Sequence, residues 1–301
     1  MKTLINITLA ASLSALTAQA ALVTDNLAQE LNADDIGAVT DGSTWTARTG
    51  SNAPLKDKGT GDLTKVAATV NGGLTSSVFA NTLSTDSYQR AGALGATTTF
   101  LTGTTLSVEL WINTSFTGIP TTSHTIFETG GATRGMSITL GDNGSGTKNT
   151  LRFAMKDAVN SAFVDVTLDA AAMANFTNDD HHQLAVTYDN VNNMSLYIDG
   201  ALAGANTSTG VIDWDGTSIA GFWGQDGSGN GALALTLDDD IATTSINGKG
   251  QGSIAVFRQY SDALTAGEVL QNYASTIPEP GTYALLAGCF ALASVMIRRR
   301  R

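Results

Sequence analysis

Apolar and polar residues alternate along three segments of the chain, 106–112, 183–188 and 194–199. Successive side chains of a β-strand point to opposite faces, so this period of two predicts strands that pack one face on a core. The predicted core positions are Val108, Leu110, Ile112, Leu184, Val186, Tyr188, Met194, Leu196 and Ile198. On the opposite face of the first strand, Glu109 and Trp111 are expected to pack in the interior or, alternatively, to line a shallow concave surface.

Turn-forming residues connect these strands into hairpins. The run Asp-Asn-Val-Asn-Asn over 189–193 predicts a turn between the second and third strands. Asp199-Gly200 predicts a further hairpin, with a return strand through 201–203. The remaining strand candidates are 136–140, 151–155, 163–168 and 254–260.

One helix is predicted near the end of this region. Thr265 and Glu268 have the spacing of a capping box, in which a hydroxyl and a carboxylate each satisfy an otherwise free backbone amide. Val269, Leu270 and Tyr273 are then expected to face the core. Closely spaced strands, antiparallel hairpins and one late helix together predict an all-β fold, a two-sheet antiparallel jelly-roll sandwich.

The N-terminus predicts export from the cytoplasm. Lys2 precedes an apolar run that extends from Leu4 to Leu16, and Ala18 and Ala20 have the small-x-small form that signal peptidase cuts. Residues 1–20 are therefore predicted to be a signal peptide. This leaves 21–277 as one folded domain.

The C-terminus combines a Pro-Glu-Pro turn, an apolar run over 282–297 and a basic end; the residues of the turn and the basic end are Pro278, Glu279, Pro280, Arg298, Arg299, Arg300 and Arg301. The apolar run predicts one transmembrane helix, and the arginines predict that its far end stays in the cytoplasm. The order resembles the PEP-CTERM sorting signal of bacterial proteins. The resemblance implies an exosortase-type sorting enzyme as a partner, and 278–301 as a sorting segment. The alternative is an ordinary membrane anchor.

Net charge narrows the choice of partners. Removal of Lys2 and the four terminal arginines takes away five positive charges, and removal of Glu279 takes away one negative charge, so the formal charge of −11 becomes −15. Phosphate binding depends on lysines and arginines, so nucleic acid and anionic membrane surfaces are poor partners. Neutral polysaccharide and calcium remain compatible. The only cysteine, Cys289, lies in the apolar tail, so the domain is predicted to have no disulfide.

Four segments in a fixed order carry a second resemblance, namely 106–112, 181–189, 196–200 and 254–268. They are similar to the laminin G-like, concanavalin A-like domains, and the resemblance covers roughly residues 90 to 275. It implies a double antiparallel sheet that binds sugars or proteins, sometimes through calcium, and that hydrolyses glycans in some branches. The chain departs from the family pattern at Asp180 and in the loops after Val211.

Catalytic motifs are absent from the sequence. Glycan hydrolysis on this kind of sandwich needs two flanking carboxylates, and no Glu stands two residues before an Asp in the order Glu-x-Asp. The glutamates of 21–277 are Glu30, Glu109, Glu128 and Glu268, and the last is explained as a cap. Gly-x-Ser-x-Gly, His-Glu-x-x-His and phosphate-loop motifs are also missing. The sequence therefore predicts a protein that is not an enzyme, with a pair of carboxylates from separate strands as the alternative.

Two adjacent histidines, His181 and His182, look like metal ligands beside Asp179 and Asp180. Neighbours in an extended strand point to opposite faces, so the two imidazoles cannot easily share one ion. A packing and hydrogen-bonding role is predicted for them instead.

Ligand and calcium sites are predicted in the loops. An aromatic platform beside amides and carboxylates suits sugar binding, and the residues with this combination are Asp213, Trp214, Asp215, Trp223, Gln225 and Asp226. The alternative is that both tryptophans pack under their own loops. No cofactor is required, but a structural Ca²⁺ is compatible with oxygen-rich loops; the candidate ligands are Asp142, Asn143, Asp238, Asp239 and Asp240.

The sequence as a whole predicts an exported, non-catalytic binding module. It is expected at the cell envelope, cell surface or extracellular matrix, anchored in the cytoplasmic membrane for a time or permanently, and it is expected to recognise an extracellular polysaccharide or a surface protein. A structural matrix protein without a discrete ligand is one alternative, and a glycan hydrolase is the other.

Overall fold

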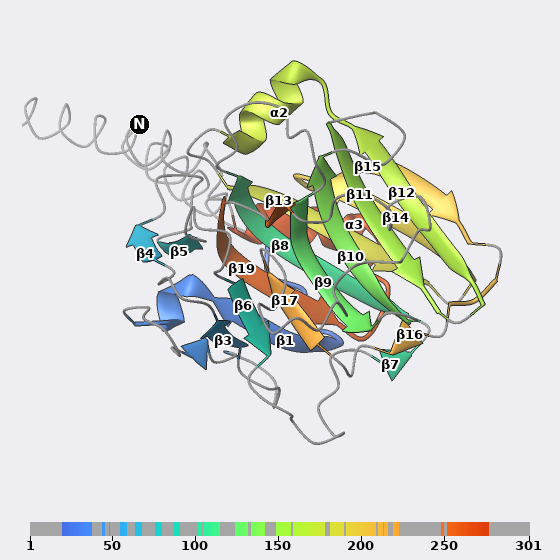
Figure 1. Cartoon of the computed structure of the whole chain (residues 1–301), viewed down its shortest axis with the longest axis horizontal. Coiled ribbons are helices and arrows are strands. Elements are labelled where there is room, and N and C mark those ends of the chain that lie inside the picture. The colour runs from blue at the N-terminus through green and yellow to red at the C-terminus, as the bar shows by residue number, and fades with distance from the viewer. Residues whose placement is uncertain are drawn as a thin grey trace, which may run out of the picture.

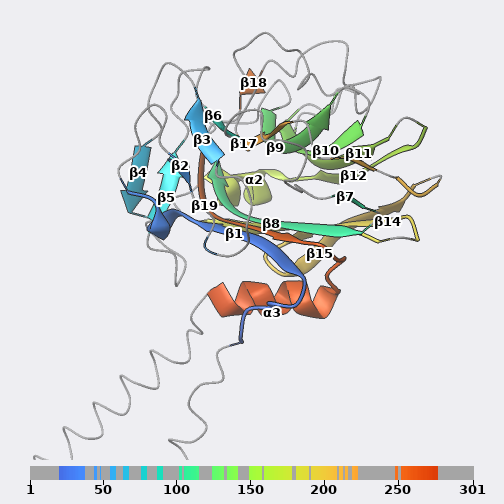
Figure 2. The ribbon, with the colours of Figure 1, turned by 90° about the horizontal axis from the view of Figure 1, so that it is seen from below.

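The computed structural model is a sandwich of two β-sheets with a helix on its outer face (Figures 1 and 2). It describes residues 20–37, 44–45, 48, 55–58, 64–67, 76–79, 87–90, 102–103, 105–114, 124–131, 134–141, 149–157, 159–177, 181–189, 191–208, 210–212, 214–215, 219–222, 248–249 and 252–276. The predicted all-β, two-sheet architecture is confirmed.

The first sheet has eight strands. Its path runs through β15 (Ala201–Thr207), β14 (Asn193–Ile198), β13 (His182–Tyr188), β8 (Leu106–Thr114), β19 (Gly252–Tyr260), β5 (Ser76–Phe79) and β4 (Thr64–Ala67). In addition, β1 (Leu27–Asn32) pairs antiparallel with β19. The N-terminal strand of the domain therefore lies beside its last strand.

The second sheet has nine strands. Its path runs through β12 (Ser161–Thr167), β11 (Thr150–Lys156), β10 (Arg134–Gly141), β9 (His124–Gly131), β17 (Ile219–Phe222), β6 (Ser87–Arg90), β3 (Leu55–Lys58) and β2 (Thr44–Trp45). The strand β18 (Gly248–Lys249) pairs parallel with β9, whereas the other described pairings are antiparallel. A separate two-stranded ladder joins β16 (Trp214–Asp215) to β7 (Thr102–Gly103).

Apolar side chains from both sheets meet in one core, as the alternation predicts. Val108, Leu110 and Ile112 of β8 are fully buried and pack with Met136 and Phe153 of the opposite sheet. The opposite face of β8 is buried too, because Trp111 lies in a separate apolar cluster with Ala255, Val256 and Tyr273. The expectation of interior packing for Glu109 and Trp111 is thus confirmed, and the alternative of a concave surface is wrong.

The predicted hairpins are confirmed, and their turn chemistry is visible. Asp189 closes the β13–β14 turn, because its carboxylate accepts bonds from the backbone amides of Val191 and Asn193, at 2.9 and 2.8 Å. Asp199 and Gly200 have φ values of 50° and 76° between β14 and β15. Positive φ at both central residues belongs to a type I′ turn, whose twist matches that of the strands it joins.

In the described ranges, the sheets are accompanied by the helical segments η1 (Ala33–Asp35), α2 (Ala170–Thr177) and α3 (Ala266–Thr276). The capping box at the start of α3 is confirmed, since the Thr265 amide donates to the Glu268 carboxylate at 2.8 Å. Val269 is buried as expected, but Leu270 is 53% exposed, so its predicted core position is wrong. The helix lies flat on the sheet, and the N-terminal segment around Val23 passes beside it (Figure 2).

The sequence-based prediction missed α2. Asp169 accepts a bond from the Ala172 amide at 2.8 Å, which is an N-terminal cap, and the next four residues include three alanines. Met173 and Phe176, three residues apart, are buried in the core. The cap and this spacing were the signal that could have identified the helix.

Both termini of the chain lie beyond the described residues. Ala18 and the other signal-peptide residues 1–19 are outside them, as is the whole predicted sorting segment 278–301. Within the described part of the chain, none of the helices has the length and apolar character needed to cross a membrane.

Candidate functional site

Most of the predicted ligand and calcium residues lie outside the described residues. These are Asp142, Asn143, Asp213, Trp223, Gln225, Asp226, Asp238, Asp239 and Asp240. Trp214 and Asp215 are placed by their backbone, which forms β16 and pairs with Gly103 and Thr102. In the described ranges, no three His, Cys, Asp or Glu side chains group to hold a metal ion. The site predictions therefore stay predictions.

The backbone around β16 is nevertheless fixed to one end of the sandwich. We call this surface the β16 end and define it as residues 159–160, 191–192, 210–212 and 214–215. The Ile212 amide donates to the Tyr188 hydroxyl at 2.6 Å, and the Asn160 side chain donates to the Val211 carbonyl at 3.1 Å. A third bond, from the Ser208 amide to the Asn192 carbonyl at 3.0 Å, joins the β13–β14 turn to the same end.

Apolar side chains project from this end. Val159, Val191 and Val211 are all exposed, and they sit on three different turns that the bonds above bring together. Asn160 is half-exposed and places its side-chain amide beside Val211. Amides beside apolar surface suit a ligand that carries both hydroxyl groups and C–H faces. The β16 end, which includes the backbone of Trp214, is therefore the candidate binding surface.

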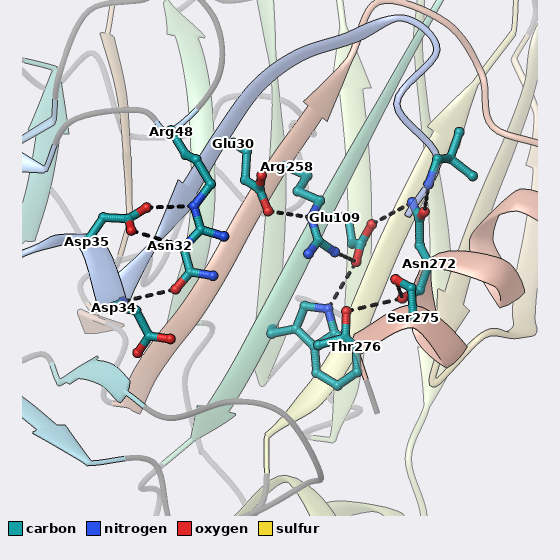
Figure 3. A network of polar contacts seen from close by, with 12 residues as sticks. Glu30, Asn32, Asp34, Asp35, Arg48, Glu109, Arg258, Asn272, Ser275 and Thr276 are labelled. Atoms are coloured by element: carbon teal, nitrogen blue, oxygen red, sulfur yellow. Dashed lines mark hydrogen bonds and ion pairs between the residues drawn. The ribbon is translucent and has the colours of Figure 1, made fainter. Parts of the chain in front are cut away.

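The most prominent polar cluster of the fold lies elsewhere, under α3 (Figure 3). Arg258 of β19 stands between two glutamates: its Nε donates to Glu30 of β1 at 3.1 Å, and its NH1 donates to Glu109 of β8 at 2.7 Å. All three side chains are buried. Burial alone would lower the pKa of Arg258, but the charges of Glu109 and Glu30 raise it overall, so the guanidinium stays protonated.

Helix α3 closes this cluster from outside. Asn272 is fully buried. Its side-chain nitrogen donates to Glu109 and to the Tyr260 hydroxyl, each at 2.9 Å. Its side-chain oxygen accepts a bond from the Val23 amide at 2.9 Å. Trp111 donates to Glu109 at 2.9 Å. Burial, and then the Glu109 charge, raises the pKa of Tyr260. The acids of this cluster are sequestered and hydrogen-bonded, which suits a structural role and excludes contact with a polymeric substrate.

The two histidines have separate partners, as predicted. The Nε2 atom of His181 lies 2.9 Å from the Ser253 hydroxyl, and Nδ1 of His182 lies 2.7 Å from the Asp199 carboxylate. Burial, with a further contribution from the His182 charge, lowers the pKa of His181 to about 4. His181 and Ser253 are both buried, so this pair has no access to a substrate and serves packing.

An ordered aromatic group marks the outer face of the edge strand β12. Phe163 is 38% exposed, and the guanidinium of Arg152 lies 4.2 Å from the centre of its ring. Asp165 holds Arg152 with two bonds of 2.6 and 2.8 Å. The Asn206 side chain of β15 donates to the Phe163 carbonyl at 2.6 Å. Sequence reasoning missed this cluster because its members are far apart along the chain.

Comparison with known proteins now identifies the family. Residues 84–270 match the family described as the Concanavalin A-like lectin/glucanases superfamily, which is more than half of the chain. The chain belongs to this superfamily. The match begins before β6 and ends within α3, so the concanavalin A-like domain includes the candidate surface at the β16 end. No curated protein matches the chain.

Several solved structures share the concanavalin A-like fold. The binding domain of botulinum neurotoxin serotype D/C is 13% identical with a TM-score of 0.54, over 82% of this chain and 53% of that one. Domain 4 of AbnA, a GH43 extracellular arabinanase from Geobacillus stearothermophilus, in complex with arabinotriose, has the same identity and TM-score over 82% of this chain and 98% of that one. Botulinum neurotoxin type C, whose cell entry is dependent upon interaction with two ganglioside molecules, is 15% identical with a TM-score of 0.54, over 81% and 52%. The chain spans about half the length of the neurotoxin chains, and at these identities the likeness shows the fold alone.

Proposed function

We propose that this protein is a non-catalytic module that recognises a glycan outside the cytoplasm. Within a superfamily of lectins and glucanases, one observation favours binding over hydrolysis. Glu30 and Glu109 are the two glutamates that converge in the described part of the chain, and Arg258 and α3 hold them inside the fold. A general acid and a nucleophile must flank the scissile bond of a substrate. This pair cannot.

The remaining glutamates support the same conclusion. Glu268 is occupied by the capping box of α3. Glu128 lies in β9, where its backbone pairs with Ser137. Three of the four glutamates of 21–277 thus have structural partners. Glycosidase pairs also use aspartate, so glycan hydrolysis is kept as the less favoured alternative.

The ligand is proposed to bind at the β16 end. Trp214 and Trp223 would supply aromatic faces for sugar rings, and Asp213, Asp215, Gln225 and Asp226 would supply hydrogen bonds. Structural neighbours support a glycan, because one of them is described with arabinotriose and another depends upon two ganglioside molecules. A surface protein is the second candidate partner, favoured by a neurotoxin binding domain described in complex with rat synaptotagmin II.

A polysaccharide-binding assay with the purified protein tests this proposal. We expect retention on neutral plant or bacterial polysaccharides, and loss of retention in Trp214→Ala and Trp223→Ala. Leu270→Ala is the matched control, because it removes an exposed apolar side chain from α3 instead of from the β16 end. Absence of binding to every polysaccharide and envelope extract tested would contradict glycan recognition. Equal binding by both tryptophan variants would contradict only the location of the site.

Export and sorting belong to the same proposal. Residues 1–20 would be removed as a signal peptide, and an exosortase-type enzyme would process the PEP-CTERM-like segment 278–301, whose apolar part holds the chain in the membrane until then. The supporting features are the termini of the sequence. Mass spectrometry of the protein from its native cell tests the step. A mass that ends near the Pro-Glu-Pro is expected, and retention of Arg301 would indicate an ordinary membrane anchor instead.

A structural calcium ion remains a subsidiary proposal for the loops that contain Asp142, Asn143 and Asp238 to Asp240. The chemistry of the donors is suitable, because carboxylate and amide oxygens are the ligands that calcium prefers. Thermal melting with and without EDTA tests it. A lower midpoint in EDTA is expected, and an unchanged midpoint would remove calcium from the proposal.

A further inference from the structure

Two exposed leucines lie on the same outer side of the first sheet, beside α3 (Figure 2). Leu202 of β15 is 58% exposed and is paired with Tyr197 of β14, which belongs to the same apolar cluster as Val269 of α3. Residues directly opposite each other in an antiparallel pair project to the same face, so Leu202 points to the side of the sheet that carries α3. Leu270, 53% exposed, is on α3 itself and lies against the turn at Gly200, two residues before Leu202. The proposed glycan site at the β16 end uses neither leucine.

Neutral side chains surround these leucines on the outer side of β14 and β15. Glu268 and Asp199 lie at the border of this surface, and both are engaged. Glu268 accepts the capping bonds of α3, and a carboxylate oxygen of Asp199 lies 2.7 Å from Nδ1 of His182. A neutral surface can approach a membrane without the repulsion that acidic groups meet at anionic lipids. We call this surface the α3 face and define it as the outward side chains Asn193, Ser195, Leu202, Ala205, Thr207 and Leu270.

Both ends of the domain join it at α3. At the N-terminal end, the side chain of Gln271 donates to the carbonyl of Ala21, the predicted first residue after the signal peptide, at 2.7 Å. At the C-terminal end, the helix stops at Thr276, about 8 Å further along its axis, and Pro278 follows two residues later. The predicted signal peptide and the predicted sorting segment are therefore attached to the same side of the sandwich.

The reach of the chain after α3 determines which side can face the membrane. Five residues, 277–281, separate Thr276 from the apolar run over 282–297. Even when fully extended, this connection spans at most about 20 Å. A domain of the size of 21–277 has a radius of gyration of about 18 Å, so its full width is greater than this reach. While 282–297 lies in the bilayer, the α3 side is held close to the lipid, and the far face of the second sheet is out of reach.

We infer that the α3 face rests on the lipid bilayer while the chain is anchored, with Leu202 and Leu270 in contact with lipid. The inference rests on the proposed membrane-held state of 278–301. Tethering by a short connection raises the effective concentration of a contact to about the millimolar range, so that the burial of two leucines is enough to populate it. Processing of the tail would end the tether, so this contact belongs to the anchored form of the protein.

Fluorescence quenching in vesicles tests the contact. The full chain is reconstituted in phosphatidylcholine vesicles that contain a lipid with a spin label on its headgroup. Ala205→Cys on the α3 face and Val159→Cys in the second sheet, each combined with Cys289→Ser, provide one labelling site at an exposed position. We expect quenching of a fluorophore at position 205 and none at position 159, because Val159 lies between β11 and β12, away from α3.

A second variant tests the part that the leucines play. Leu202→Ser combined with Leu270→Ser removes the apolar side chains without adding charge. The contact measured at position 205 is expected to weaken at least about tenfold, because the burial of both leucines is lost. Val191→Ser, which removes an exposed apolar side chain from the β16 end, is the control and should leave quenching at position 205 unchanged.

The native Cys289 reports on the anchor separately, because it lies inside the apolar run. In the parent chain it should be shielded from a water-soluble thiol reagent in intact vesicles. A shielded Cys289 without quenching at position 205, or with equal quenching at positions 205 and 159, would overturn the contact and leave anchoring intact. A reactive Cys289 would refute anchoring and this contact together. Quenching at position 205 in native membranes but not in lipid vesicles would assign the α3 face to a membrane protein and overturn the lipid contact.

Discussion

Two regions of the molecule differ in where polar and apolar groups lie. The first is the seam, the buried cluster of Glu30, Glu109, Arg258 and Asn272 that joins β1, β8, β19 and α3. The second is the edge strand β15. At the seam, charged side chains are buried, and each carboxylate has a cation or an amide against it (Figure 3). At the β15 edge, Leu202 is exposed, and a bulge at Ala203 interrupts the pairing with β14. Buried charges with full partners fix structure, whereas a bulge interrupts an edge strand and limits its pairing with another strand. The seam is therefore the region on which the stability of the domain is expected to depend most.

The seam also explains how the two ends of the domain are held together. Val23 and Glu30 come from its start, and Arg258 and Asn272 come from its end, so the contacts span 249 and 228 residues of sequence. The strand β1 and the helix α3 can complete the sheet and its cover only when both ends are present. Folding is therefore expected to finish only after the whole domain has been made.

The largest expected effect comes from breaking the seam. Arg258→Met leaves Glu30 and Glu109 buried without their cation, and a broken buried ion pair typically destabilises a protein by about 3–5 kcal/mol. Urea unfolding monitored by circular dichroism measures the change in the free energy of unfolding. Arg48→Met is the matched control, because the Arg48–Asp35 pair is exposed, at 45% and 37% of the side-chain surface, and such pairs contribute less than about 1 kcal/mol. Equal losses in both variants would refute the structural role of the seam.

A second variant tests how tightly the edge strand packs on its neighbour. A Cβ added at Gly204 would meet Val164 Cγ1 and Val166 Cγ2, both at 2.9 Å. Gly204→Ala is therefore expected to destabilise the protein by about 1–3 kcal/mol, as overpacking usually does, and to push β15 away from β12. Ala205→Ser, on the exposed face of the same strand, should be near neutral. A Gly204→Ala protein as stable as the parent would mean that the edge is loosely packed.

Sequence alone predicted the elements whose signal is local. The alternation in β8, the type I′ turn at Asp199-Gly200 and the capping box at Thr265 each depend on a few neighbouring residues, and all three are confirmed. Leu270 was assigned to the core because helical spacing shows which residues share a face, but not how that face meets the sheet. In the structure the backbone turn at Gly200 lies directly against Leu270 and Tyr273.

The alternation of apolar and polar residues does not predict contacts between side chains that are far apart in the sequence. Nothing in the sequence joins Arg258 to Glu109, which lies 149 residues earlier, or Asn206 to Phe163. The predicted ligand residues Trp223 and Asp226 rest on composition alone and lie outside the described residues, so that prediction is still to be tested. Side-chain chemistry suggested a site, and its place in the fold stays a prediction.

Acid sensitivity is expected from the buried contact between His181, just before β13, and Ser253 of β19. The folded protein keeps the pKa of His181 near 4, below the ordinary value of 6.5, so the unfolded chain takes up a proton first as pH falls. Stability is unaffected above about pH 6.5 and falls between there and pH 4, by about 2 kcal/mol at pH 5. Urea unfolding at pH 7 and pH 5 measures this loss.

Two variants separate the histidine from other acid-sensitive groups. His181→Gln should lose this part of the pH dependence, since glutamine does not titrate. Ser253→Ala removes the hydrogen-bond partner but keeps the imidazole, so the dependence should persist at a lower overall stability. An identical pH profile in the parent and His181→Gln would show that other groups cause the acid sensitivity.

The smallest expected effect concerns the helix that covers the seam. Glu268→Ala removes the carboxylate that accepts the Thr265 amide and hydroxyl, both at 2.8 Å, and loss of such a cap typically lowers stability by about 1 kcal/mol. Because Asn272 sits one turn further along α3 and bonds Glu109, fraying of the first turn should also speed amide exchange at Val23. Ala266→Ser, an exposed change in the same first turn that keeps the Glu268 carboxylate, is the control. If Glu268→Ala accelerates exchange at the β15 edge instead of at Val23, the seam and the edge are not independent regions.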